Sequence, residues 1–172
     1  MSEKFLVVID NILSREECDT VIKMAESQKL EYIDRGNANY YRTIFINKEW
    51  ADNLYRKLYN YIPKIYNGMQ IVGLNDHFRF SKYEPGGRFE VHKDNINQDS
   101  QGNRSIFTLN IFLNSNFNGG ETDFLFDDMR TLRLSAIPKT GRGALFDSQQ
   151  FHRGNAVSNG YKYLLRTDVM VR

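Results

Sequence analysis

The chain has 172 residues, of which 41% are hydrophobic and 26% charged, and this composition is typical of one soluble globular domain. Its 23 Lys and Arg residues nearly balance its 21 Asp and Glu residues, and the net charge of +2 argues against a nucleic-acid or anionic-membrane partner. Cys18 is the single cysteine, so no internal disulfide can form. No apolar run approaches the ~20 residues that span a bilayer, and no signal peptide is evident at the start, so we expect a cytoplasmic protein.

The first 70 residues are expected to form a short strand at Phe5–Ile9 and two supporting helices. Ser14 and Glu17 have the spacing of a capping box, and the residues behind them recur at helical spacing on one face. Asn47 is expected to cap the second helix, which ends at Pro63. The predicted apolar faces are Cys18, Val21, Ile22 and Ala25 in the first helix, and Ala51, Leu54, Tyr55, Leu58 and Ile62 in the second.

After residue 70 the sequence changes to short segments rich in β-branched and aromatic residues, separated by Gly, Asn, Asp and Pro. Helical patterns no longer alternate with these segments, which favours antiparallel sheets in a sandwich or jelly roll. We therefore expect a single domain over 1–172, mainly β in an α+β class, with helical support at roughly 1–70 and a β core at roughly 71–172. The predicted strands are Ile71–Tyr83, Ser105–Leu113, Thr122–Phe126, Thr131–Ala136, Gly143–Phe146 and Tyr161–Val171.

Three residues of this β region have the chemistry of metal ligands. His92 and Asp94 are two positions apart, so in an extended segment their side chains point to the same side. His152 follows 58 residues after Asp94, where a paired sheet can bring it to the same point. Two imidazoles and one carboxylate on one face of a metal leave positions open, as in non-haem Fe(II) oxygenases, although the same donors also suit zinc.

Two cations follow the third candidate ligand on one predicted strand. Lys162 and Arg166 lie on the same face of Tyr161–Val171, because side chains four residues apart along a strand point the same way. Near a metal, either cation can pair with the far carboxylate of a dicarboxylate cosubstrate, Arg in a bidentate manner and Lys as a point charge. The alternative is that both are solvent-facing cations on an edge strand.

From about Gly73 to Arg172 the chain resembles the prolyl 4-hydroxylase-like branch of the 2-oxoglutarate/Fe(II)-dependent dioxygenases. The order, spacing and number of the matching blocks carry this resemblance, and no single block does. The blocks are Tyr83–Asp94, Thr108–Asn114, Gly119–Phe124, Pro138–Gly141, Ala144–Phe146, His152–Val157 and Gly160–Lys162.

The resemblance implies a double-stranded β-helix, or jelly-roll, core with Fe(II) held by His92, Asp94 and His152. It places Lys162 at the C5 carboxylate of 2-oxoglutarate, with Arg166 as a rival for that role. Tyr83 and Thr108 match positions whose hydroxyls often bind the cosubstrate. The implied cofactors are Fe(II), 2-oxoglutarate and O2, with ascorbate as an optional reductant.

The implied reaction is hydroxylation of an unactivated C–H bond with release of succinate and CO2, most readily on a prolyl residue of a protein or peptide. A free amino acid or other small metabolite is the alternative substrate. Asp94 matters here, because a variant of the superfamily with Ala or Gly at that position halogenates instead. Two other readings are a non-catalytic jelly-roll binding module and a zinc hydrolase, and the latter leaves the spacing to Lys162 unexplained.

The sequence departs from the family pattern at Phe112, where a tyrosine is common and where a phenyl ring cannot donate a hydrogen bond. Glu121 is either a residue that orients a ligand or a solvated turn carboxylate. His77 precedes the motif without a spaced partner and is expected to be ordinary. The Asn37–Asn47 stretch and the loop between His92 and Asn103 are expected to be polar loops at the mouth of the site. Arg104 and Asn110 are further candidates for substrate contacts.

Overall fold

The computed structural model describes residues 4–172. Met1 to Glu3 lie outside the described residues, and they belong to the stretch in which the sequence shows no evident signal peptide. Its helices are α1 (Arg15–Glu26) and α2 (Lys48–Leu58). Its strands are β1 (Leu6–Ile9), β2 (Glu31–Asp34), β3 (Ala38–Ile46), β4 (Ile65–Tyr66), β5 (Met69–Leu74), β6 (His77–Tyr83), β7 (Arg88–His92), β8 (Arg104–Phe112), β9 (Asn118–Gly119), β10 (Thr122–Leu125), β11 (Leu132–Ala136), β12 (Gly143–Asp147), β13 (His152–Gly154), β14 (Val157–Asn159) and β15 (Lys162–Val171).

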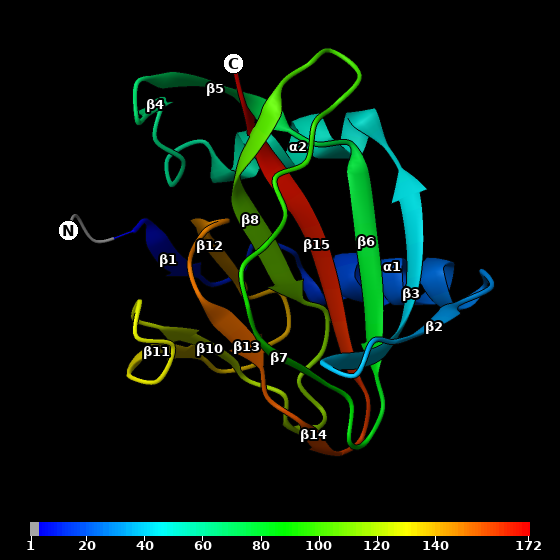
Figure 1. The fold of residues 1–172 in the computed structure, drawn as a ribbon. Helices are drawn as coiled ribbons and strands as arrows, with labels where there is room; N and C mark the ends of the chain where they lie inside the picture. The colour runs from blue at the N-terminus through cyan, green and yellow to red at the C-terminus, as the bar shows by residue number, and fades with distance from the viewer. Residues whose placement is uncertain (1–3) are drawn as a thin grey trace.

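One curled antiparallel sheet contains almost all of the described strands, in the order β1-β12-β8-β15-β6-β3-β7-β13-β10-β11. Figure 1 shows the long strands β8, β15, β6 and β3 side by side as one layer, with β7 across its lower part and β13, β10 and β11 to its lower left. The arrangement is the jelly roll, or double-stranded β-helix, that was expected. No described helix is long and apolar enough to cross a membrane.

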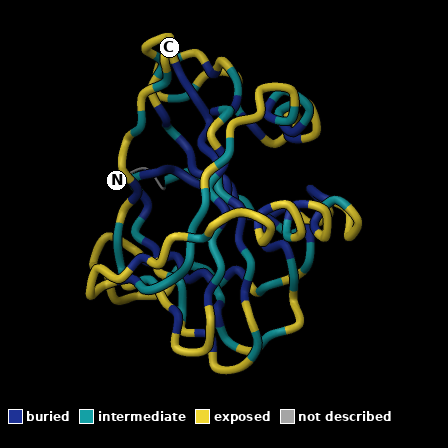
Figure 2. Tube along the Cα trace, turned by 90° about the vertical axis from the view of Figure 1, so that its right-hand side faces the viewer, coloured by how far each residue is buried: buried dark blue, intermediate teal, exposed yellow. Residues whose placement is uncertain are grey.

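The long strands have two faces, and each face packs against a different part of the molecule. Residues such as Leu165 and Val169 join α1 and α2 in the main core. Leu164, their neighbour on β15, belongs to a second apolar cluster with Phe112 and Phe124. This alternation is the two-residue period of a strand. Figure 2 shows the result as buried tube through the middle of the molecule and exposed turns at its ends.

The predicted helix caps are present. The Ser14 hydroxyl accepts a hydrogen bond from the Glu17 amide at 3.1 Å, and the Ser14 amide donates to the Glu17 carboxylate at 2.7 Å. Asn47 Oδ1 accepts from the Trp50 amide at 2.9 Å. Helix α2 ends at Leu58, a turn earlier than predicted, and the chain then turns so that Ile62 still packs in the core.

The first 70 residues contribute more than helices. Strands β2 and β3 occupy this region, and β3 pairs with both β6 and β7. The Asn37–Asn47 stretch is therefore mostly strand rather than the expected loop, because its alternating Tyr, Arg, Ile and Phe residues suit a half-buried strand. The predicted strand Ile71–Tyr83 divides into β5 and β6 at Asn75, whose Oδ1 accepts the His77 amide at 3.1 Å and turns the chain.

Candidate active site

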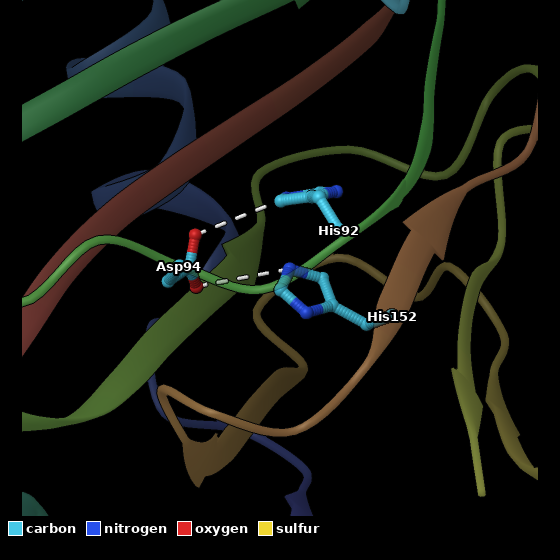
Figure 3. Close-up of side chains that lie close together, drawn as sticks. All are labelled: His92, Asp94 and His152. Carbon is cyan, nitrogen blue, oxygen red and sulfur yellow. Dashed lines mark ion pairs between the residues drawn. The ribbon is translucent and has the colours of Figure 1, made fainter. Parts of the chain in front are cut away.

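The three candidate ligands come from two paired strands and the turn after one of them. His92 ends β7 and His152 begins β13, and these antiparallel strands place the two histidines directly opposite each other. Asp94 lies two residues beyond the end of β7, where its amide donates to the Ser148 carbonyl at 2.9 Å. Ligand atoms of the three side chains lie within 4.8 Å of one another. Figure 3 shows both imidazoles turned toward the carboxylate.

Each histidine presents the same ring nitrogen to Asp94. Nδ1 of His92 lies 2.7 Å from the Glu90 carbonyl, and Nδ1 of His152 lies 2.9 Å from the Gln150 carbonyl. Because a carbonyl only accepts, Nδ1 carries the proton and donates, which leaves the Nε2 lone pair for a metal. The Nε2 atoms lie 3.8 and 3.7 Å from the Asp94 carboxylate oxygens.

Burial keeps both imidazoles neutral. It lowers the pKa of His92 to about 4, with the neighbouring His152 acting in the same direction, and it also lowers the pKa of His152. Metal binding requires neutral imidazole. Two neutral imidazoles and one carboxylate, with their second nitrogens fixed by backbone carbonyls, fit the donor set of a ferrous facial triad.

Asp94 is buried and held from two sides. Arg166 Nη1 donates to Oδ1 at 2.5 Å, and the Thr108 hydroxyl donates to Oδ2 at 2.6 Å. Burial by itself raises the pKa of this carboxyl, but Arg166, His152 and Thr108 outweigh burial and hold the pKa of Asp94 below its ordinary value. The carboxylate is therefore ionised, as a metal ligand must be.

Strand β15 places the two candidate cations on the face of the long strands that lines the same cavity as His92 and His152, here called the inner face. Lys162 pairs with Tyr83 of β6, and Arg166 lies between Arg79 of β6 and Asn110 of β8. The strand lies between β6 and β8 rather than at an edge, so the alternative of two solvent-facing cations on an edge strand does not hold.

Lys162 is 2% exposed, and its ammonium donates to the Gly120 carbonyl at 2.7 Å. Its Nζ also lies 5.0 Å from the centre of the Tyr83 ring and 5.4 Å from that of Phe112. Burial lowers its pKa to about 8, an effect that the charge of Glu121 partly opposes. No residue from 4 to 172 forms an ion pair with Lys162 at salt-bridge distance, so this buried charge has no carboxylate partner in that part of the chain.

Arg166 is engaged by two carboxylates of the chain. Its Nη1 bonds Asp94, and its Nη2 donates to Asp168 Oδ1 at 3.2 Å. Asp168 is 1% exposed and also accepts from Arg79 at 3.2 Å and from Asn97 at 2.7 Å. The Arg166 charge is thus already balanced within the fold, in contrast to that of Lys162.

One cavity is lined by the three candidate ligands His92, Asp94 and His152, here called the metal-ligand group, and also by Lys162 and Arg166. Tyr83 lines it and stacks on Tyr40 with ring centres 5.1 Å apart. Thr108 does not line it, because its hydroxyl points to Asp94 instead. The residues around the cavity are Tyr40, Arg42, Arg79, Ser81, Tyr83, Phe89, His92, Asp94, Asn110, Thr122, His152, Gly154, Lys162, Leu164 and Arg166.

The remaining candidates occupy different places. His77 is exposed and pairs with Asp76 outside the cavity. Glu121 lies near Lys162 and not among the metal-ligand group. Arg104 is exposed at the start of β8, whereas Asn110 lines the cavity at 7% exposure.

Eight cavity residues were not singled out by the sequence analysis as individual candidates: Tyr40, Arg42, Arg79, Ser81, Phe89, Thr122, Gly154 and Leu164. Tyr40 and Arg42 lie in the stretch expected to line the mouth of the site. They are two residues apart along Ala38–Ile46, and this spacing, which places both side chains on one face of a strand, was the signal that the sequence offered. Arg79 occupies the position opposite Arg166 in β6, and only the strand register reveals that neighbour.

Residues 78–167, half of the chain, match the family model of the 2OG-Fe(II) oxygenase superfamily. A search of curated proteins gave no match.

The fold is similar to several solved structures. The viral collagen prolyl hydroxylase vCPH of Paramecium bursaria Chlorella virus-1, solved with 2-oxoglutarate, has 23% identity and a TM-score of 0.69, over 98% of this chain and 97% of that one. A Pseudomonas putida prolyl-4-hydroxylase has 13% identity and a TM-score of 0.73, over 97% and 92%.

A prolyl hydroxylase of Trichoplax adhaerens, in complex with a hypoxia inducible factor peptide fragment, has 17% identity and a TM-score of 0.73, over 96% of this chain and 83% of that one. At these identities the structural likeness establishes the shared fold, and the family model establishes the family. The expected resemblance is confirmed: the chain belongs to the 2OG-Fe(II) oxygenase superfamily and is an Fe(II)- and 2-oxoglutarate-dependent dioxygenase.

Proposed function

We propose that this dioxygenase hydroxylates an unactivated C–H bond of a prolyl residue in a protein or peptide, with release of succinate and CO2. The single observation that carries the cosubstrate part of this proposal is the buried Lys162 ammonium, which faces the cavity without a carboxylate partner among residues 4–172. An unpaired buried charge costs several kcal/mol, so a bound anion would stabilise it.

His92, Asp94 and His152 would hold the ferrous ion. Iron and 2-oxoglutarate together supply the O2 activation that breaks an unactivated C–H bond. The protein's part is to present two Nε2 atoms and one carboxylate in fixed orientation, and the backbone carbonyls behind the histidines and the Thr108 hydroxyl behind Asp94 do so.

Lys162, rather than Arg166, would bind the C5 carboxylate of 2-oxoglutarate. Both cations line the cavity, but Arg166 already donates to Asp94 and Asp168. Lys162 donates to a single backbone carbonyl and has further N–H groups to offer. Tyr83 lies beside it and lines the same cavity, where its hydroxyl would add a hydrogen bond to the cosubstrate.

A wall of stacked aromatic rings beside the metal-ligand group supports a prolyl substrate. Phe89 stacks on His92 with ring centres 3.7 Å apart, and Tyr40 stacks on Phe89 at 6.1 Å and on Tyr83 at 5.1 Å. A flat apolar surface suits a pyrrolidine ring, which has no polar atoms of its own apart from the amide nitrogen. The prolyl hydroxylases of similar fold, one of them bound to a peptide, point to the same substrate class.

The cosubstrate assignment is tested by measuring 2-oxoglutarate binding to Mn(II)-loaded protein, in which the reaction cannot proceed. Lys162→Met removes the buried charge and keeps an unbranched side chain, so we expect at least tenfold weaker 2-oxoglutarate binding with unchanged Mn(II) affinity. Lys82→Met is the matched control, because Lys82 is a surface lysine paired with Glu26. Unchanged 2-oxoglutarate affinity in Lys162→Met would assign the carboxylate to another residue.

The reaction is tested with Fe(II), 2-oxoglutarate, ascorbate and a panel of prolyl peptides. We expect succinate release that depends on peptide, and a peptide product heavier by one oxygen atom. His152→Ala should abolish both signals while the chain stays folded. Succinate release stimulated by free amino acids but by no peptide would instead support the small-metabolite alternative.

A further inference from the structure

The cavity is lined by four cations and one carboxylate. The cations are Arg42, Arg79, Lys162 and Arg166, and the carboxylate is Asp94. If Lys162 and the metal face the two carboxylates of 2-oxoglutarate, the three arginines form a separate group. The strand register shows where this group lies.

The three arginines lie on three adjacent strands and line the same cavity. Arg42 of β3 pairs with Ser81 of β6, and Arg166 of β15 pairs with Arg79 of β6. Arg42 and Arg79 are therefore diagonal neighbours on one face, about 7–8 Å apart at the backbone and within reach of long side chains. Ser81, directly opposite Arg42 and two residues from Arg79, is a small side chain that lines the same cavity.

These arginines lie at a distance from the proposed cosubstrate carboxylate. Arg166 is four residues beyond Lys162 on β15, a separation of roughly 13 Å at about 3.3 Å per residue. Lys162 and Arg166 are therefore far enough apart along the strand to contact different anionic groups.

The arginines differ in how far their charge is balanced. Arg79 and Arg166 share the buried Asp168. Arg42 pairs with Glu31 at 2.8 Å, but the Glu31 side chain is 66% exposed. A solvent-exposed pair of this kind contributes about 0–1 kcal/mol, so another carboxylate can replace Glu31 at little cost. A guanidinium has five donors, and Arg42 and Arg79 each use one of them in a hydrogen bond to a described side chain.

Asn110 contributes to the cavity a buried polar atom that lacks a hydrogen-bond partner. Asn110 of β8 is 7% exposed, lies next to Arg166 across the sheet, and lines the cavity. Its Oδ1 accepts no hydrogen bond from the described part of the chain. Buried polar atoms are nearly always satisfied, so an unsatisfied one beside a cavity indicates a group that a ligand completes.

We propose that the substrate of this enzyme carries a carboxylate that binds between Arg42 and Arg79, with Asn110 hydrogen-bonding a polar group of the same molecule. This inference rests on the proposed function and names its substrate class. The carboxylate is either the free carboxylate of a small substrate or chain end, or the side chain of an acidic residue near the hydroxylated position. Arginine binds a carboxylate through two parallel hydrogen bonds, so the contact also fixes orientation.

The test compares pairs of probes that differ only in charge, by saturation-transfer NMR on the full chain with diamagnetic Zn(II) and 2-oxoglutarate. N-acetyl-L-proline is paired with its amide, and N-acetyl-Ala-Pro-Glu-amide with its Gln analogue. We expect the carboxylate probe to bind at least tenfold tighter than its neutral partner in at least one pair. Preference in the first pair assigns a free carboxylate, and preference in the second an acidic side chain.

Arg42→Gln should remove the preference, and Arg88→Gln, which removes an exposed arginine of β7 paired with Glu90, should keep it. Equal binding of acids and amides, or binding of none of them, overturns the proposal. Failure of the proposed function is seen separately, as an absence of 2-oxoglutarate binding before any probe is added. If 2-oxoglutarate does not bind, the probe comparison is repeated on the metal-free chain, where the arginines still carry their charge.

Discussion

Arg166 Nη1 lies 2.5 Å from Asp94 Oδ1, so a permanent cation contacts a residue of the metal-ligand group. The same guanidinium reaches Asp168, and through it the Asn97 side chain of the loop that follows Asp94. Arg166 therefore balances Asp94 when no metal is bound, and a bound divalent ion shares that carboxylate with it. Two measurable consequences follow for stability.

Arg166→Met should destabilise the metal-free protein by about 3–5 kcal/mol, because it leaves the buried Asp94 and Asp168 short of a partner. In a domain of this size that corresponds to a fall in Tm of roughly 6–20 °C. Mn(II) should then raise the Tm more in the variant than in the wild type, since the ion replaces the lost charge at Asp94. Thermal unfolding with and without Mn(II) measures both effects, and equal metal-induced shifts in the two proteins would contradict this role.

Thr108→Val should weaken metal binding and not cosubstrate binding. The substitution keeps the shape of the side chain but removes the 2.6 Å hydrogen bond to Asp94 Oδ2. Loss of a group that orients a ligand typically costs 10–100-fold in metal affinity. Mn(II) titration should show that loss, Thr108→Ser should restore binding, and 2-oxoglutarate affinity at saturating Mn(II) should stay unchanged. A selective loss of 2-oxoglutarate affinity would instead restore Thr108 to the cosubstrate contact expected from the family resemblance.

The sequence was sufficient to predict the fold class, the helix caps and the convergence of His92, Asp94 and His152, because each depends on local pattern or on a motif with fixed spacing. The alternation along Tyr161–Val171 correctly placed Lys162 and Arg166 on one face. The arrangement of these two cations relative to other strands could not be predicted. One of the two partners of Arg166 is Asp94, which is 72 residues away in sequence, and no local pattern encodes that contact.

Strand β3 shows a second limit of the sequence. Its aromatic and polar residues were expected to form a loop at the mouth of the site, and they do contribute Tyr40 and Arg42 to the cavity. Their strand conformation depends on pairing with β6 and β7, which lie later in the chain. Propensity for a strand is realised only where such partners exist, so a half-polar segment of this kind is ambiguous when read alone.

Cosubstrate binding should weaken at alkaline pH. Burial lowers the pKa of Lys162 from 10.5 to about 8, so the ammonium proposed to bind the cosubstrate carboxylate is lost as the pH rises through about 8. The Kd for 2-oxoglutarate, measured with Mn(II), should therefore increase between pH 7 and pH 9.5. A flat profile over that range would argue against Lys162 as the cation.

The same pKa shift predicts the opposite trend for stability. Between pH 8 and pH 10.5 the unfolded chain binds more protons than the folded chain at this site, so the contribution of Lys162 to the free energy of unfolding rises with pH. Lys162→Met should remove this contribution. Urea unfolding of both proteins at pH 8 and pH 10 measures the difference, and an identical pH dependence in the two would contradict the buried-lysine assignment.

Gly120→Ala should weaken 2-oxoglutarate binding through the side chain of Lys162. The φ of Gly120 is +69°, and a Cβ at this position would lie 3.1 Å from Lys162 Cδ and 2.9 Å from the Phe117 ring. The lysine would have to shift away from the Gly120 carbonyl that now fixes its ammonium. We expect a loss of 2-oxoglutarate affinity in addition to the ~1–2 kcal/mol cost of a left-handed alanine.

Gly86→Ala separates these two effects. Gly86 also has a left-handed φ, +86°, but nothing lies within 4 Å of a Cβ there. This control should therefore lose similar stability to unfolding in urea while its 2-oxoglutarate affinity stays at the wild-type value. If both variants lose affinity to the same extent, the loss reflects general backbone strain, and the position of the lysine ammonium against Gly120 is not what determines cosubstrate binding.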